Sequence, residues 1–183
     1  MRNNFPEKKY NIIYADPPWS YRDKAQAGKR GSSFKYDTQS KEWICDLPVQ
    51  EIVEKDCVLF LWVTMPQLPN AFEVIEHWGF DYKTCAFSWV KKYKKADTWF
   101  MGMGHWTRSN GELCLLGTKG RPKRKSASVK SVIESPIEEH SKKPDIVRDK
   151  IVELCGDVPR IELFARQKAE GWDSWGKEVA WAG

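Results

Sequence analysis

The chain has 183 residues, of which 41% are hydrophobic and 30% are charged, and its formal net charge is +5. This length and composition predict one soluble, globular domain over residues 1–183 and exclude a disordered chain. The small basic excess permits a polyanionic partner without requiring one. Ten tryptophans are many for this length, and such rings serve either in the core or as platforms on which planar ligands stack.

No segment has the pattern of a membrane span or a signal peptide. The longest apolar run, Cys57 to Val63, is far shorter than the ~20 residues that cross a bilayer, so we expect no membrane association. The five cysteines are widely spaced and form no CxxC pair, which predicts reduced core thiols in a cytoplasmic protein. The three histidines have no partner at metal-ligand spacing, so we expect no metal site.

Short apolar runs alternate with helical patterns along the chain. Strands are expected at residues 11–15, 57–63, 80–90, 112–117 and 160–165. Helices are expected at residues 40–53, in short pieces, at 66–79 and at 144–156. The polar segments at residues 20–37, 91–111 and 118–142 are expected to be long loops, and a polar tail follows the last strand. This alternation predicts an α/β fold with a mostly parallel central sheet.

The most specific motif is Asp16-Pro17-Pro18-Trp19, directly after the first expected strand. Prolines end a strand, and in open α/β sheets ligands bind beyond the carboxyl ends of strands. The Asp16 carboxylate and the Pro17 carbonyl are two acceptors that match the two hydrogens of an exocyclic amine. Trp19 offers a face on which a purine can stack. The alternative is a proline turn that only ends the strand, with Asp16 bonded to its own backbone.

These four residues resemble the catalytic motif of methyltransferases that modify the amino groups of nucleic-acid bases, and the whole chain resembles the MT-A70 family. Three further blocks carry this resemblance in the family's order, namely Gly104 to Gly120, Lys142 to Asp145 and Ile161 to Gly176. The resemblance implies a Rossmann-like class I methyltransferase fold with helices on both faces of the sheet and a permuted motif order. It also implies methyl transfer to the N6 amine of adenine, with the base flipped into the Asp16-Pro17-Pro18-Trp19 pocket.

S-adenosyl-L-methionine is the cofactor that the resemblance implies. Lys143, at the start of a helix, suits its carboxylate by charge and by helix dipole, and Asp16 lies near its sulfonium in the resemblance. The other expected contacts follow the last strand and are Phe164, Arg166, Lys168, Lys177 and Glu178. Lys168-Ala169 and Lys177-Glu178 stand where eukaryotic members carry His-Asn and Asn-Gln, so the ribose contacts depart from the family pattern.

Basic and aromatic residues of the loops are expected to contact the phosphates and bases of a nucleic acid. They are Tyr21, Arg22, Lys29, Arg30, Tyr36, Lys92, Trp99, His105, Arg121, Lys123 and Arg124. For the basic tracts the alternative is a solvated loop, and for Trp99 it is a place in the core. DNA is the expected substrate and RNA a close variant. The chain is expected to act as a monomer, a homodimer or a heterodimer with a related subunit.

Two other functions fit parts of the sequence. A cytosine-N4 methyltransferase uses the same pair of acceptors, because that pair serves any exocyclic amine. Aspartate rather than serine before Pro17, together with the later blocks, favours adenine. A catalytically silent nucleic-acid-binding subunit of a heterodimer is the second alternative. Such subunits usually lose the acidic residue, whereas Asp16 is present here.

Overall fold

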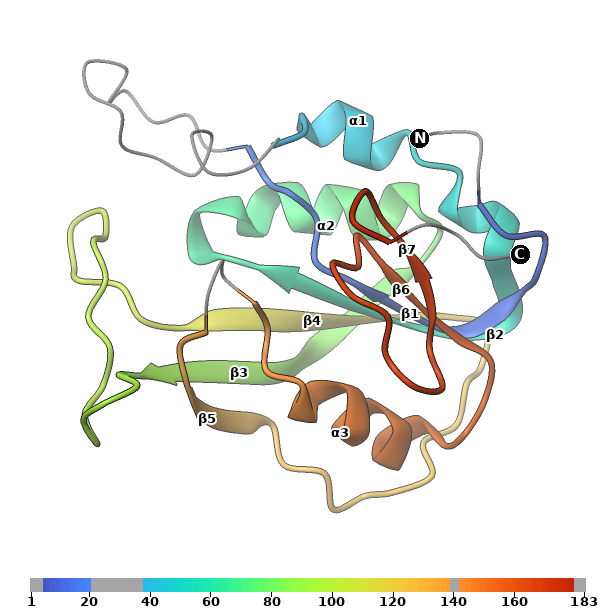
Figure 1. The fold of residues 1–183 in the computed structure, drawn as a ribbon. Coiled ribbons are helices and arrows are strands. Elements are labelled where there is room, and N and C mark those ends of the chain that lie inside the picture. Colours follow the sequence, from blue (N-terminus) through green and yellow to red (C-terminus); the bar gives the residue numbers. More distant parts are fainter. Residues whose placement is uncertain (1–4, 21–37, 139–141, 180–183) are drawn as a thin grey trace.

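A seven-stranded sheet forms the centre of the computed structural model, which describes residues 5–20, 38–138 and 142–179 (Figure 1). The strands are β1 (Tyr10–Ala15), β2 (Val53–Val63), β3 (Asp81–Lys92), β4 (Glu112–Lys119), β5 (Val132–Pro136), β6 (Arg160–Leu163) and β7 (Asp173–Trp175). Their order across the sheet is β5-β3-β4-β2-β1-β6-β7. Among these strands β4 alone runs against the others, so the prediction of a mostly parallel sheet is confirmed.

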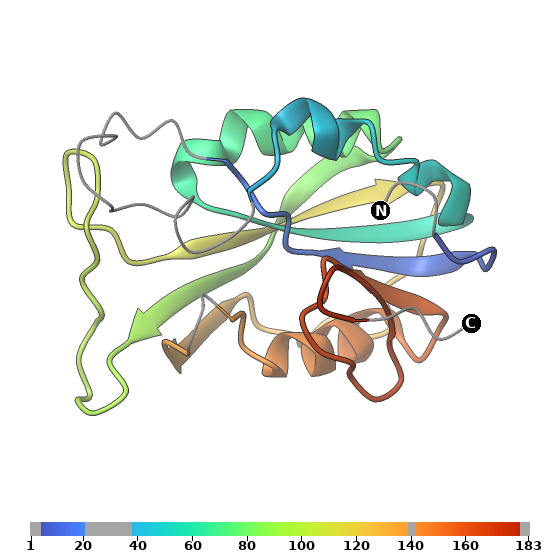
Figure 2. The ribbon, with the colours of Figure 1, turned by 45° about the horizontal axis from the view of Figure 1, so that its top comes forward.

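Helices cover both faces of the sheet (Figures 1 and 2). They are α1 (Lys41–Cys45), α2 (Leu68–His77) and α3 (Ile146–Cys155), with 3-10 turns at Val49–Ile52 and Met65–Gln67. α1 and α2 lie on one face of the sheet and α3 lies on the other. The central strands are therefore buried on both sides, which explains why β1 and residues 57–63 of β2 are nearly continuous apolar runs.

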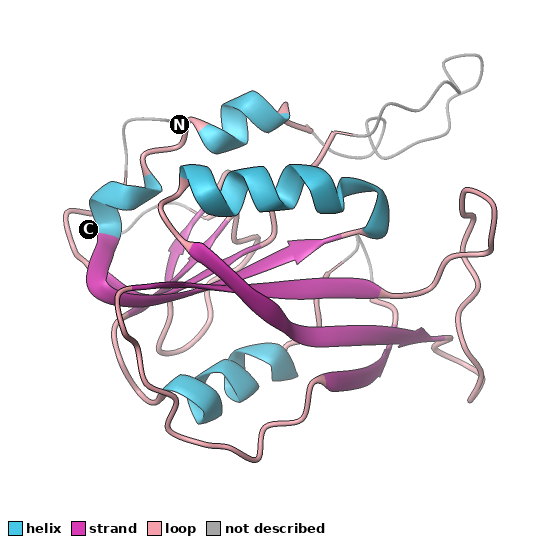
Figure 3. Ribbon diagram, turned by 180° about the vertical axis from the view of Figure 1, so that it is seen from behind, coloured by secondary structure: helices cyan, strands magenta, loops and turns pink. Residues whose placement is uncertain are grey.

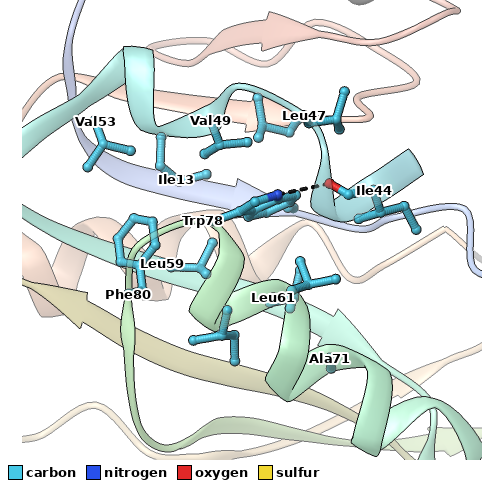
Figure 4. Packing of buried hydrophobic residues seen from close by; sticks show 14 of the residues in the cluster. Ile13, Ile44, Leu47, Val49, Val53, Leu59, Leu61, Ala71, Trp78 and Phe80 are labelled. Carbon is cyan, nitrogen blue, oxygen red and sulfur yellow. Dashed lines mark hydrogen bonds between the residues drawn. The ribbon is translucent and has the colours of Figure 1, made fainter. Parts of the chain in front are cut away.

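The core between the sheet and the first two helices is closed by Trp78 (Figure 4). Its ring is fully buried beside Ile13 of β1 and Leu59 of β2. The indole N–H donates to the carbonyl oxygen of Ile44, at the end of α1, over 2.9 Å. Leaving a buried N–H without an acceptor costs about 1–3 kcal/mol, so this bond allows a tryptophan to fill the space between α1 and α2.

On the opposite face, α3 is attached by apolar packing and by one ion pair. Val147 and Ile151 are fully buried in a cluster that includes Phe60 of β2. Arg148 donates from Nε and Nη2 to the two carboxylate oxygens of Glu162 on β6, over 2.7 and 3.0 Å. A two-pronged pair of this kind fixes direction as well as distance. The first turn of α3 is thereby held at a set position against β6.

Two strands were not expected from the sequence. β5 lies inside the segment predicted as a loop, and β7 lies in the predicted polar tail. Both are short edge strands, and in β5 only Ile133 is buried, so neither gives a long apolar pattern. The last predicted strand is also shorter than expected, because Phe164 takes a left-handed φ of 61° that ends β6.

Candidate active site

β1 lies between β2 and β6, and the connections to these two neighbours run in opposite directions across the sheet. From β1 the chain moves to β2 on one side, and much later it returns to β6 on the other side of β1. Ala15 and Leu163 pair at the carboxyl ends of these two parallel strands, and Asp16 and Phe164 follow them. Open α/β sheets bind their ligands at such a switch point. The strained, left-handed backbone of Phe164 lies at the same place.

Asp16 is held at this edge by a row of alternating charges. Lys143 Nζ lies 2.9 Å from Asp16 Oδ2 and 3.1 Å from Glu112 Oε2. Glu112 Oε1 in turn accepts from Lys91 Nζ over 2.5 Å. We call Asp16, Lys143, Glu112 and Lys91 the ion-pair row. It joins the ends of β1, β4 and β3 to the segment that leads into α3, so residues far apart in sequence converge there.

The pKa values of the two carboxylates in this row are shifted in opposite directions. Burial raises the pKa of Asp16, and the nearby Lys143 ammonium offsets that only in part. Burial alone would also raise the pKa of Glu112, but Lys143 and Lys91 outweigh it and lower that pKa. The two carboxylates raise the pKa of Lys143 despite its burial, so it stays charged. Asp16 is therefore the carboxylate of the row that most readily takes up a proton.

The main chain of the Asp16-Pro17-Pro18-Trp19 motif is anchored by its own hydrogen bonds. The Pro17 carbonyl accepts the N–H of Trp19 over 2.8 Å, and the Pro18 carbonyl accepts the N–H of Gln39 over 2.8 Å. A carbonyl oxygen has two lone pairs, so Pro17 keeps one for a further donor. The motif thus offers one carboxylate and one half-used carbonyl at the end of β1.

Trp19 itself is a packing residue in this structure. Its side chain belongs to the core cluster under α1 and α2, and only 6% of the residue is exposed. Its indole N–H donates to the carbonyl oxygen of Trp62 over 3.0 Å. This burial leaves little of the ring open to a purine, and the stacking of a base on Trp19 stays a prediction.

The other predicted cofactor contacts follow β6 and β7, whose carboxyl ends lie on the same edge as that of β1. Phe164 packs against the ring of Trp175, with the centroids 5.5 Å apart. Arg166 is close enough to Asp16 to lower its pKa. The remaining three are exposed, namely Lys168, Lys177 and Glu178. A Cβ on Gly176 would collide with the Ala165 carbonyl oxygen, so the two segments approach closely at this edge.

The predicted nucleic-acid contacts separate into three groups. Five of them lie outside the described residues, namely Tyr21, Arg22, Lys29, Arg30 and Tyr36. Lys92, Trp99 and His105 lie at the end of β3 and in the β3–β4 loop (residues 93–111), which projects from the edge that carries Asp16 (Figures 1 and 3). Trp99 is 46% exposed under the ammonium of Lys92, so it is not a core residue.

The third group, Arg121, Lys123 and Arg124, is at the wrong edge for its predicted role. These residues follow β4, and because β4 is antiparallel its carboxyl end lies at the edge opposite Asp16. There the Arg121 N–H donates over 2.7 Å to Oδ1 of Asp56, a residue in the first half of β2. The basic tract (residues 119–125) then runs to the end of α3, where Lys125 N–H donates to Leu154 O.

Sequence comparison shows to which family the chain belongs. The MT-A70 family model matches residues 10–178, which include the ion-pair row. The chain belongs to the MT-A70 family of methyltransferases. It is 37% identical to the Type II methyltransferase M.MunI of Mycoplasma sp, over 95% of this chain and 79% of that protein.

The eukaryotic relatives match a smaller part of their own length. The chain is 30% identical to a putative N(6)-adenosine-methyltransferase MT-A70-like protein of Medicago truncatula and 29% identical to the human N(6)-adenosine-methyltransferase catalytic subunit METTL3. It covers 27% and 26% of those two proteins, so it spans about a quarter of their length. Membership of the MT-A70 family confirms the expected class I methyltransferase fold, into which the mixed sheet with helices on both faces fits.

The candidate site at the switch point contains residues that the sequence did not predict. Lys91 and Glu112 were not expected there, although a charged residue opening an apolar strand is a signal for Glu112. Asn110 closes the base of the β3–β4 loop, because its side chain bonds the N–H and carbonyl of Lys91 and the carbonyl of Phe100. Within the described ranges, no cluster of three or more His, Cys, Asp or Glu side chains could hold a metal ion.

Among the described helices, none is long and apolar enough to cross a membrane.

Proposed function

We propose that this chain transfers a methyl group from S-adenosyl-L-methionine to the exocyclic N6 amine of adenine in DNA. The observation that carries the proposal is the Asp16 carboxylate, fixed beside the Pro17 carbonyl at the switch point of a methyltransferase fold. The two eukaryotic relatives are named as N(6)-adenosine-methyltransferases, which supports the N6 amine as the acceptor.

DNA is proposed as the substrate because of the fraction of each relative's length that this chain matches. One relative that matches over most of both lengths is the Type II methyltransferase M.MunI. Adenosine is a ribonucleoside, and it stands in the names of proteins of which this chain spans only about a quarter. Basic residues of the β3–β4 loop at the edge of Asp16 supply charge for a phosphate backbone.

The residues of the motif would act on the amine. Its lone pair is delocalised into the purine ring, which makes it a poor nucleophile. The Asp16 carboxylate and the free lone pair of the Pro17 carbonyl would each accept one amine hydrogen, which favours a pyramidal nitrogen with an available lone pair. Forming the N–C bond, at the expense of the methyl–sulfur bond of the donor, would leave the nitrogen cationic and ready to lose a proton. The raised pKa of Asp16 suits its carboxylate to take that proton. The chain contributes mainly orientation and electrostatics.

The residues at the switch point fit the cofactor. When bound, S-adenosyl-L-methionine supplies an activated methyl group on a cationic sulfonium, and two carboxylates of the ion-pair row lie at this place. Lys143 would hold the cofactor carboxylate, exchanging it for one of the two carboxylates that it contacts here. Phe164 and Arg166 lie at the same edge. Lys168, Lys177 and Glu178 are exposed there and would contact the ribose and the amino-acid end.

The experiment combines a labelled methyl donor with digestion to nucleosides. The protein is incubated with methyl-labelled S-adenosyl-L-methionine and either duplex DNA, single-stranded DNA or RNA, and the product nucleosides are separated. N6-methyldeoxyadenosine from DNA is the expected product. N4-methylcytosine would instead assign the same two acceptors to a cytosine amine. Binding of nucleic acid without any transfer would identify a silent subunit.

A further inference from the structure

Large apolar side chains point into solvent along the β3–β4 loop. Such side chains are usually buried, and an exposed group of them marks a contact site. The exposed residues are Tyr93, Trp99, Met101, Met103 and Trp106. Met103 and Trp106 are the most exposed, at 89% and 96%. Both lie in the loop tip (residues 101–109), where no other described part of the chain covers them.

The loop tip is braced by its own hydrogen bonds. Arg108 donates to the carbonyl oxygens of Gly102 and Met101 over 2.7 and 3.0 Å. The Ser109 hydroxyl donates to the Met103 carbonyl over 2.9 Å, and Trp106 takes a left-handed φ of 74°. These bonds fold the segment into a tight turn. Met103 and Trp106 are therefore displayed by a closed turn rather than by an open strand of polar chain.

The base of this loop is tied directly to the proposed methyl-transfer site. Lys91 and Glu112 flank the loop in sequence and are bonded to each other. Glu112 then contacts Lys143, which holds Asp16. From this base the loop extends beyond the sheet at the edge of Asp16 (Figures 1 and 3). The tip therefore projects from the same edge of the sheet as Asp16.

The charge around the apolar tip favours a nucleic acid over a second protein. Residues 92–111 contain Lys92, Lys94, Lys95 and Arg108 and one acidic residue, Asp97. In a symmetric dimer, equivalent patches face each other, so these cations would oppose their own copies. Lys92 is paired here with Asp97 and Glu134, whereas Lys94 and Lys95 are exposed and can meet a phosphate backbone. Exposed apolar and aromatic side chains on a loop that also carries basic residues are the combination with which proteins enter a base stack.

We propose that Met103 and Trp106 enter the base stack of duplex DNA beside the target adenine. Met103 would wedge between two base pairs, and the Trp106 ring would stack on the base that loses its neighbour when the adenine leaves the helix. This rests on the proposed methyl transfer to adenine, and it assigns the opening of the duplex to two named residues. Asp16 would then serve the methyl transfer, and the loop tip would help to extrude the adenine from the duplex.

The test compares substrates that need opening with substrates that do not. Met103→Ala, Trp106→Ala and the double variant are assayed on a fully paired duplex, on the same strand alone, and on a duplex with the target adenine opposite an abasic site. Extrusion requires breaking a few kcal/mol of stacking and pairing, and the last two substrates need little of it. The double variant is expected to lose about 10- to 100-fold in kcat/KM on the paired duplex and less than about 2-fold on the others.

Val132→Ala is the matched control, because it removes an exposed apolar side chain from the edge strand β5, away from the loop tip. Fluorescence of 2-aminopurine at the target position gives a second readout, and it should rise on binding of the wild type but not of the double variant. An unchanged rate on the paired duplex, or equal losses on all three substrates, would overturn the proposal. If the double variant and the wild type differ in oligomeric state in sedimentation, the proposal is overturned in favour of a protein interface. If the wild type methylates none of the substrates, the proposed function itself fails.

Discussion

Lys143 donates from Nζ to Asp16 Oδ2 over 2.9 Å, across 127 positions of sequence. The same ammonium contacts Glu112, so one cation links the ends of two strands through the segment before α3. The side chains of Lys143 and Glu112 are only 10% and 8% exposed, which weakens screening by solvent. The carboxylate at the end of β1 therefore has its position fixed by the way the rest of the sheet closes around it.

Lys143→Met tests the structural part of this relationship. Removing the ammonium leaves Asp16 and Glu112 as neighbouring carboxylates without the cation between them. Breaking a buried pair by deleting one partner costs about 3–5 kcal/mol, and we expect the free energy of unfolding to fall by that order. Chemical denaturation measures it. Lys168→Met, at an exposed position, should change stability by less than about 0.5 kcal/mol. Equal stability of both variants would contradict a stabilising role.

Glu112→Gln should destabilise the protein in a pH-dependent way. The folded-state pKa of Glu112 is lowered, so its contribution to stability is present above its unfolded pKa and is lost as the pH falls through its folded value. The difference in unfolding free energy between wild type and Glu112→Gln should therefore be largest near neutral pH and shrink in acid. Denaturation at a series of pH values measures it. A difference independent of pH would show that the ion pairs of Glu112 do not carry its effect.

The raised pKa of Asp16 has the opposite sign for stability and a consequence for the reaction. A raised folded-state pKa means that stability is present below the unfolded pKa and is lost as the pH rises through the folded value. For methyl transfer the ionised form is needed, because a protonated carboxyl is a weaker acceptor. The usual pKa of aspartate is ~3.9. We expect kcat/KM to fall in acid with a midpoint above that value. A rate that stays constant down to that value would exclude Asp16 as the titrating group.

Trp19→Phe separates packing from base stacking. It removes the N–H that bonds the Trp62 carbonyl but keeps an aromatic ring. If Trp19 only packs, the variant should lose about 1–3 kcal/mol of unfolding free energy, with kcat/KM unchanged at temperatures where it stays folded. A fall in kcat/KM without a fall in stability would return Trp19 to the role of a stacking platform.

The two basic segments should respond differently to charge removal. Lys92 ends β3, and Lys94 and Lys95 begin the β3–β4 loop at the edge of Asp16. Arg121, Lys123 and Arg124 lie at the opposite edge. Changing the first three to Gln should weaken DNA binding and reduce the slope of log K against log salt by about 0.9 for each phosphate that is no longer neutralised. The second triple variant is the control of equal charge change. A larger effect from the far-edge variant would contradict the placement of DNA at the edge of Asp16.

The sequence predicts the position of the motif because its signals are local. Asp16 follows an apolar run and the two prolines end that run, so the end of a strand could be located without tertiary information. Lys143 before a helix is also a local signal.

What the sequence does not predict depends on strand direction and on distant partners. An apolar run does not reveal which way a strand points, so the antiparallel course of β4 placed Arg121 at the opposite edge from the one expected. The partners of Glu112 lie on β3 and before α3, and no spacing rule joins them. The burial of Trp19 likewise follows from the helices that cover it rather than from its neighbours in sequence.

The most direct measurement is methyl transfer by Asp16→Asn on DNA, together with its affinity for S-adenosyl-L-methionine. Asparagine keeps the shape and one acceptor oxygen but loses the charge, while Lys143 keeps its pair with Glu112, so the fold should persist. We predict a loss of about 10²–10³-fold in kcat, because a positioned electrostatic partner of the reacting group is removed. Cofactor affinity should change by less than about 10-fold, a difference of ~1.4 kcal/mol. A folded Asp16→Asn protein that methylates DNA at the wild-type rate would contradict the central role of this carboxylate.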